Sequence, residues 1–214
     1  MTFQNVGYRL FRVRRQPSRS SRCQRGMKLL LLALATAVAA RSQQLEVKLD
    51  VNATKVNYTV GDVLHNVHGT FKLTRGDLWV EQGSGQAGGE LAVNSASGDS
   101  GSHARDSRMR KNILESQFYP EIIFIPDRIE GKLDMRGHSQ FQLHGMFSIH
   151  GSRHELTMNV DSDVQGERVK ATAAFVVPYV KWGMKNPSTL FLRVDDTVPI
   201  QIDAVGQITP SGNR

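Results

Sequence analysis

Hydrophobic and polar residues alternate along most of the chain from residue 45 onward. Every second position is apolar in six runs: 45–49, 56–60, 141–149, 156–160, 169–177 and 198–204. Successive side chains of a β-strand point to opposite faces, so this alternation predicts strands with one buried face. In "FQLHGMFSI", for example, Phe141, Leu143 and Phe147 share one face, and His144 lies on the other.

Turn-forming residues separate these runs. They are "RGD" at 75–77, "GSGQAGG" at 83–89, "EGK" at 130–132, "HGS" at 150–152 and "QGE" at 165–167. Strands at this spacing favour an antiparallel meander, and about eight of them close readily into a barrel that leaves no exposed edge. We therefore predict an all-β fold, a single eight-stranded antiparallel up-and-down barrel.

Two segments interrupt the alternation. In "ARDSRMRKNILES", Asp106 stands where a helix N-cap is expected, and Met109 and Ile113 follow at i, i+4 spacing. The second segment, "PYVKWGMKNPS" at 178–188, contains two prolines and a glycine, which limit it to a turn or two. We expect one inserted α-helix and one short helical turn.

The first 40 residues differ from the rest. Residues 27–40, "MKLLLLALATAVAA", have the basic start, short apolar run and A-x-A site of a signal peptide, with cleavage near Ala39 to Ser42. Residues 1–26 are rich in Arg and Ser, and we interpret them as an extension before a true start at Met27. We expect a periplasmic or secreted protein whose mature chain has no transmembrane segment, because spanning needs about 20 apolar residues.

The net charge of the whole chain does not represent the expected mature protein. The whole-chain charge of +7 would suit a nucleic-acid partner. Residues 1–40 hold eight basic residues and no acidic one, however, and without them 19 basic residues face 20 acidic ones. We therefore expect no nucleic-acid partner. The only cysteine, Cys23, also precedes the expected cleavage site, so we expect no disulfide or thiol chemistry.

Three histidines, His144, His150 and His154, lie within eleven positions. A zinc site needs three or four converging ligands, but strand geometry places His144 and His150 about 20 Å apart. We interpret them as turn and surface histidines, and we expect no catalytic residue, metal or cofactor. Two alternatives stay open: a metal-dependent hydrolase using His150, His154 and Glu155, and a ligand-free protein-interaction barrel.

Three stretches resemble a known family. The runs "RDSRMRKNILESQFYPEIIF", "LHGMFSIHGSRHELTMNV" and "AAFVVPYVKWGMKNPS" are similar to the YceI-like family of secreted bacterial proteins. The most specific parts are Arg105-Asp106, Tyr119-Pro120 and His150-Gly151. The resemblance implies a lipocalin-like barrel domain at about 44–208, followed by a short tail at 209–214. It also implies a long apolar cavity that binds polyisoprenoid-type lipids or similar amphiphiles.

These observations predict a non-catalytic binding or carrier protein for a long-chain apolar small molecule, an isoprenoid-type lipid or a quinone-like amphiphile. Small inward residues such as Ala173 leave volume inside the barrel, and Gly145 either does the same or marks a bulge. We expect these ligand-binding residues: Phe124, Phe141, Leu143, Phe147 and Phe175 on strands, with Met109, Ile113, Trp182 and Met184 closing the mouth. A head group would meet Arg105, His103 or Lys111. Homodimer formation is left open.

Overall fold

The computed structural model describes residues 43–61, 66–190 and 193–211. The predicted N-terminal extension and signal peptide lie outside the described residues, as does the end of the predicted tail. The elements in chain order are β1 (Gln44–Leu49), β2 (Lys55–Gly61), β3 (Asn66–Glu81), β4 (Ala87–Asp99), α2 (His103–Arg108), η1 (Met109–Ile113), β5 (Glu121–Gly131), β6 (Gly137–Ile149), β7 (Ser152–Gln165), β8 (Arg168–Val177) and β9 (Val198–Pro210).

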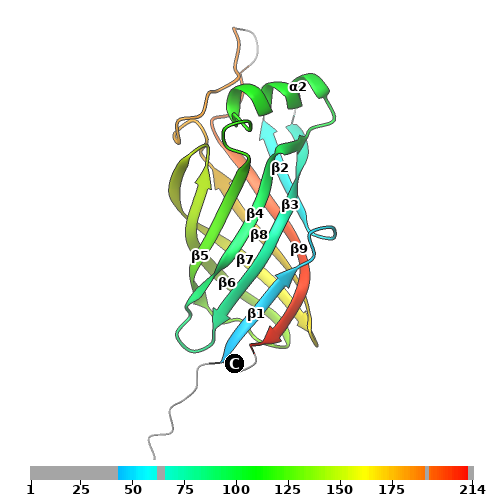
Figure 1. Cartoon of the computed structure of the whole chain (residues 1–214), viewed down its shortest axis with the longest axis vertical. Helices are drawn as coiled ribbons and strands as arrows, with labels where there is room; N and C mark the ends of the chain where they lie inside the picture. The colour runs from blue at the N-terminus through cyan, green and yellow to red at the C-terminus, as the bar shows by residue number, and fades with distance from the viewer. Residues whose placement is uncertain (1–42, 62–65, 191–192, 212–214) are drawn as a thin grey trace, which may run out of the picture. The chain divides into compact units, whose positions relative to one another are not determined.

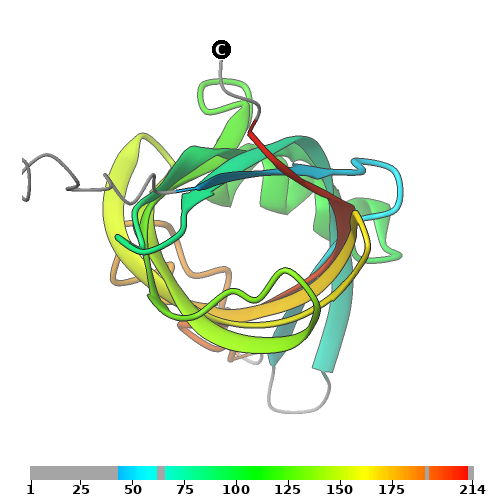
Figure 2. The ribbon, with the colours of Figure 1, turned by 90° about the horizontal axis from the view of Figure 1, so that it is seen from below.

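The strands form one closed antiparallel sheet, seen from the side in Figure 1 and along the barrel in Figure 2. The strands β1 and β2 occupy a single position in it, because each pairs with both β3 and β9. A turn separates them, in which the Asp50 carboxylate accepts the N–H groups of Asn52 and Ala53. The barrel therefore has eight strand positions, and the predicted fold class is confirmed.

The predicted alternation is confirmed in the strands. Along β6, for example, Leu143, Phe147 and Ile149 are buried, and the intervening side chains lie on the outer face. The predicted turn after β6 is also present: His150 and Gly151 have φ angles of 50° and 75° and join Ile149 to Ser152. A two-residue loop with both φ angles positive has the twist that an antiparallel hairpin needs.

The turn predicted at "RGD" is wrong, because residues 75–77 lie inside the 16-residue strand β3. The pairing of β3 with β4 shifts register between Leu73 and Arg75, which marks a β-bulge. Leu73 is buried before the bulge and Val80 after it, so the inward positions change from odd to even numbers. A bulge adds one residue to one strand, and this extra residue produces the break that resembled a turn.

The inserted helix is shorter and begins earlier than predicted. Its N-cap is Ser102, not Asp106. Asp106 is buried inside α2, where one carboxylate oxygen accepts the N–H and the hydroxyl of Ser100 at 2.9 and 2.6 Å. The carboxylate thus holds the preceding loop against the helix. The segment 178–188 forms the predicted turn, with Met184 N–H donating to the Tyr179 carbonyl.

The π-helical turn η1 follows α2 directly. The Leu114 N–H donates to the Met109 carbonyl at 2.9 Å, five residues back. Residues five apart therefore lie one above the other here, which an α-helix would not allow. This wider turn brings Leu114 to the same face as Met109 and Ile113.

Both helical insertions lie at the same end of the barrel. The segment α2–η1 connects β4 to β5, and the turn at 178–188 connects β8 to β9 (Figure 1). The beginning of β1 and the end of β9 lie at the opposite end. Within the described ranges, no helix is long and apolar enough to cross a membrane.

Candidate functional site: an apolar cavity inside the barrel

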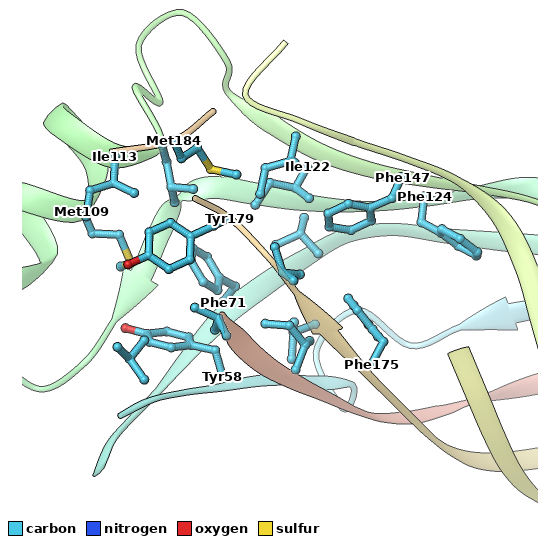
Figure 3. A pocket seen from close by; sticks show the side chains of 18 of the residues that line it. Tyr58, Phe71, Met109, Ile113, Ile122, Phe124, Phe147, Phe175, Tyr179 and Met184 are labelled. Carbon is cyan, nitrogen blue, oxygen red and sulfur yellow. The ribbon is translucent and has the colours of Figure 1, made fainter. Parts of the chain in front are cut away.

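A cavity of about 160 Å³ lies inside the helical end of the barrel (Figure 3). Its lining comprises 24 residues, and none of them is charged. The only polar side chains among them are Tyr58 and Tyr179. Away from these two hydroxyls, such a cavity offers water no hydrogen-bond partners, which favours an apolar occupant.

A second cavity of about 100 Å³ lies toward the other end of the barrel. It is also apolar, with Ser162 as its one hydroxyl. The two cavities share three lining residues, Leu91, Met158 and Ile202. These three side chains therefore form the boundary between an upper chamber, next to the helical insertions, and a lower chamber.

Eight of the nine predicted ligand-binding residues line one of these chambers. The upper chamber contains Phe124, Phe147, Phe175, Met109, Ile113 and Met184, and the lower chamber contains Phe141 and Leu143. They come from strands β5, β6 and β8 and from both helical insertions. Because the barrel closes around them, residues 75 positions apart in sequence, such as Met109 and Met184, face one space (Figure 3).

Trp182 is the exception, since it lines neither chamber. Its ring is stacked on the imidazole of His154, with centroids 4.1 Å apart and planes 5° apart. It also contacts Phe147, at a centroid distance of 5.7 Å. Trp182 therefore packs against Phe147, which lines the upper chamber, and does not itself close the mouth.

His154 is not the surface histidine that we predicted. It pairs with Phe147 across β6 and β7, which puts both side chains on the inner face of the barrel. Its Nε2 atom is buried without a hydrogen-bond partner in the described part of the chain. Burial also lowers the pKa of His154, which favours the neutral ring. The alternation through Leu156 and Met158 could have revealed this orientation.

The three residues of the hydrolase alternative do not converge. His154 faces the interior, and Glu155, the next residue along β7, is exposed on the outer face. His150 lies at the hairpin turn, where its Nε2 atom is 3.0 Å from the Glu115 carboxylate. Among the described residues no group of three metal-ligating side chains is assembled.

Glu115 and His150 instead attach the helical insertion to the β6–β7 hairpin. Glu115 follows the Leu114 C-cap of η1 and has a φ angle of 47°. The His150 ring packs against Tyr119 at a centroid distance of 4.8 Å, and Gly151 lies so close to Tyr119 that a Cβ there would be 2.6 Å from the ring. Two motifs that carried the resemblance, Tyr119-Pro120 and His150-Gly151, thus meet in space.

Gly145 marks a close approach and does not provide cavity volume. A Cβ at this position would clash with the carbonyl oxygen of Ile125 and would lie 2.7 Å from Pro126 Cα. The β5–β6 pairing shifts register at Pro126. The bulge interpretation of Gly145 is therefore correct.

The tyrosine hydroxyls are neutral donors at the helical end of the upper chamber. Burial raises the pKa of Tyr179 to about 12, helped by the charges of Asp196 and Asp195. Its hydroxyl donates to the Asp195 backbone carbonyl at 2.8 Å. Burial, followed by the charge of Asp106, also raises the pKa of Tyr58. Figure 3 shows both hydroxyls on the side of Met109.

A groove of about 460 Å³ adjoins the upper chamber at this end. Its lining comprises Tyr58, Val60, Val67, Ala104, Arg105, Arg108, Met109, Ile113, Pro187 and Val194. Six of these, Tyr58, Val60, Met109, Ile113, Pro187 and Val194, also line the upper chamber. The groove is therefore the mouth of the cavity. Tyr58, which is common to both, was not predicted as a site residue, although its place in "KVNYTV" marks it as inward-facing.

A closed barrel of eight strand positions around an apolar cavity is the architecture of the lipocalin-like barrels. The YceI-like domain matches residues 47–206, and the chain belongs to this family. No curated protein matches the chain.

Several solved structures share the fold. A polyisoprenoid-binding domain from Saccharophagus degradans, described as implicated in plant cell wall breakdown, has a TM-score of 0.59 at 13% identity over 76% of this chain and 98% of its own. Burkholderia cenocepacia BcnA has a TM-score of 0.60 at 14% identity over 75% and 99%. The Campylobacter jejuni YCEI protein has 0.52 at 13% over 70% and 88%.

Proposed function

We propose that this protein is a non-catalytic binding protein that holds a long apolar molecule, an isoprenoid-type lipid or a quinone-like amphiphile, inside its barrel. The uncharged lining of the upper chamber is the observation that carries the proposal. Burial of each CH₂ group contributes roughly 0.8 kcal/mol. A chain of several isoprene units therefore needs few polar contacts and no catalytic group to bind.

The shape of the interior supports a narrow chain. Chambers of about 160 and 100 Å³ lie in line along the barrel and meet at Met158. A chain longer than a few isoprene units requires the lining to move. Met109, Met158 and Met184 can provide this movement, because the methionine side chain is unbranched and adapts to irregular space.

Two further observations support this function and its location. The Saccharophagus degradans domain of the same fold is described as polyisoprenoid-binding. The signal peptide predicted at 27–40 favours a carrier in the periplasm or outside the cell. By contrast, a ligand-free interaction barrel would need no internal chambers, and a hydrolase would need His150, His154 and Glu155 to converge.

The direct test is native mass spectrometry of protein that is expressed with its leader and purified without detergent, followed by organic extraction. We expect an adduct that organic solvent releases as a long-chain lipid. Val177→Trp would fill the upper chamber, which Val177 lines, and should abolish the adduct. Val176→Trp is the matched control, because Val176 is 51% exposed. Folded wild-type protein that neither carries nor takes up a lipid would contradict the proposal.

A further inference from the structure

Two arginines at the mouth groove lack carboxylate partners. Arg105 and Arg108 both line the groove, and within the described ranges neither has a carboxylate oxygen within 4.0 Å. Arg75 shows the contrast, since its guanidinium binds Glu90 and Glu121, each at 2.7 Å. A guanidinium without an acidic partner beside an apolar cavity is available to a ligand.

The acidic residue nearest to them in sequence is already engaged. Asp106 is 8% exposed, and its carboxylate accepts two hydrogen bonds from Ser100. It therefore faces the loop, and its single charge balances only one of the two guanidinium charges. Arg105 donates to the Ser100 carbonyl at 3.3 Å, which orients its side chain at the groove. Other described acids of this end are also occupied: Asp99 accepts the Gly101 N–H and Glu115 pairs with His150. Asp195 and Asp196 flank Tyr179.

The charged groove and the apolar chamber form one continuous space. Tyr58, Met109 and Ile113 line both, so a molecule that moves from the chamber into the groove passes the helix that carries the arginines. The Tyr58 hydroxyl lies on the side of Met109 (Figure 3) and adds a neutral polar group at this junction. An amphiphile with its chain in the barrel would have its polar end here.

We infer that the mouth groove binds an anionic head group, a phosphate or a carboxylate, through Arg105 and Arg108. The inference rests on the proposed function and narrows its ligand class to acidic amphiphiles. The planar guanidinium matches the oxygens of both anions with two parallel hydrogen bonds. A quinone or an alcohol carries no charge for the arginines to neutralise.

Chain-matched probes test this inference. Delipidated protein is titrated with geranylgeranyl phosphate and geranylgeraniol, and in parallel with palmitate and hexadecanol. We expect the acidic member of at least one pair to bind about tenfold tighter or more, since charge-assisted hydrogen bonds contribute that much. This preference should shrink as salt rises, because the groove is open to solvent.

Variants show which residues produce the preference for the acidic lipid over the neutral one. The double variant R105Q/R108Q should lose it, whereas R110Q/K111Q should keep it. The control also removes two positive charges from the same segment. Arg110 and Lys111 line none of the three spaces, so the structure does not support the predicted contact of Lys111 with a head group. Because Arg105 also holds Ser100, R108Q alone serves as a second variant that leaves this contact intact. It should lose part of the preference without a change in thermal stability.

The outcomes separate the two proposals. Equal affinity for both members of both pairs would overturn the head-group inference and leave the proposed function intact. Failure of all four probes to bind would overturn both. Inorganic phosphate is the third arm: it should weaken geranylgeranyl phosphate binding and leave geranylgeraniol binding unchanged. If inorganic phosphate binds through the arginines while no lipid does, the site is an anion site and the lipid role is wrong.

Discussion

Single side chains decide which groups inside the barrel can carry charge. His154 is the one titratable group that β7 turns toward the interior near the mouth, where it stacks on Trp182. Its Nε2 atom has no hydrogen-bond partner among the described residues, and burial lowers its pKa. The folded protein therefore favours the neutral imidazole.

This burial predicts a pH dependence of stability. The pKa of His154 is lower in the folded than in the unfolded state, where it is about 6.5, so the unfolded state binds the proton more readily. Stability should therefore fall as pH decreases below about 6.5. In thermal melts between about pH 7.5 and about pH 5.5, His154→Phe should reduce this decrease and keep the stacking on Trp182.

The exposed His103 provides the control for this experiment. His103→Ala should leave the slope of stability against pH as it is in the wild type. The same slope for all three proteins would show that His154 ionises as easily when folded as when unfolded.

At the scale of elements, the α2–η1 insertion forms one wall of the mouth and is attached at both of its ends. Asp106 binds the loop before it through Ser100, and Glu115 binds the β6–β7 turn through His150. Between these attachments, the π-turn directs Met109, Ile113 and Leu114 into the upper chamber. Its two attachments therefore hold these three side chains in place at the chamber.

We predict that Glu115→Gln loosens this wall. The pair with His150 is partly exposed, with side chains 32% and 21% accessible, so the loss of global stability should stay below about 1 kcal/mol. Amide hydrogen exchange of residues 109–116 should become faster, because local opening of this segment becomes easier. Hydrogen–deuterium exchange with mass spectrometry measures both the extent and the location of the change.

Glu130→Gln is the matched control, because it removes an exposed pair with Arg128 in the barrel wall. It should leave the exchange of residues 109–116 unchanged. If Glu115→Gln and Glu130→Gln behave alike in this segment, the attachment through His150 does not restrain the wall.

At the scale of the whole molecule, the interior is divided into two chambers that meet at Leu91, Met158 and Ile202. Met158 comes from β7 and is 2% exposed. It is the most flexible of the three side chains. A chain that enters at the mouth meets this boundary before the lower chamber.

We predict that Met158→Ala joins the chambers and shifts bound lipids toward longer chains. The substitution should cost about 2–5 kcal/mol of stability, as large-to-small changes in cores do. Ala173→Trp fills the lower chamber, which Ala173 lines, and should shift the preference toward shorter chains. Native mass spectrometry with an isoprenoid mixture of graded length measures both shifts.

Ala174, the exposed neighbour of Ala173, provides the control for Ala173→Trp. Ala174→Trp places the same ring on the outer face of β8 and should leave the length preference unchanged. A length preference that Met158→Ala and Ala173→Trp both leave unchanged would mean that the chain does not pass the boundary.

Much of the site could be predicted because inward positions follow from alternation. Phe141, Leu143 and Phe147 were assigned to the interior by the pattern of β6 alone, and all three line a chamber. The bulge in β3 could not be predicted in this way, because its extra residue is accommodated by pairing with β4. Trp182 was misplaced for a similar reason: its partner His154 lies 28 positions away in sequence.

The sequence by itself determined the strands, their buried faces and hence the apolar interior, because the period of two is a property of the local backbone. The arrangement of the mouth and of the two chambers was decided by tertiary structure alone. Closure of the barrel brought the two helical insertions to one end, divided the interior at Met158 and left two arginines at the mouth. Such contacts depend on strand register and on residues distant in the chain, which no local pattern encodes.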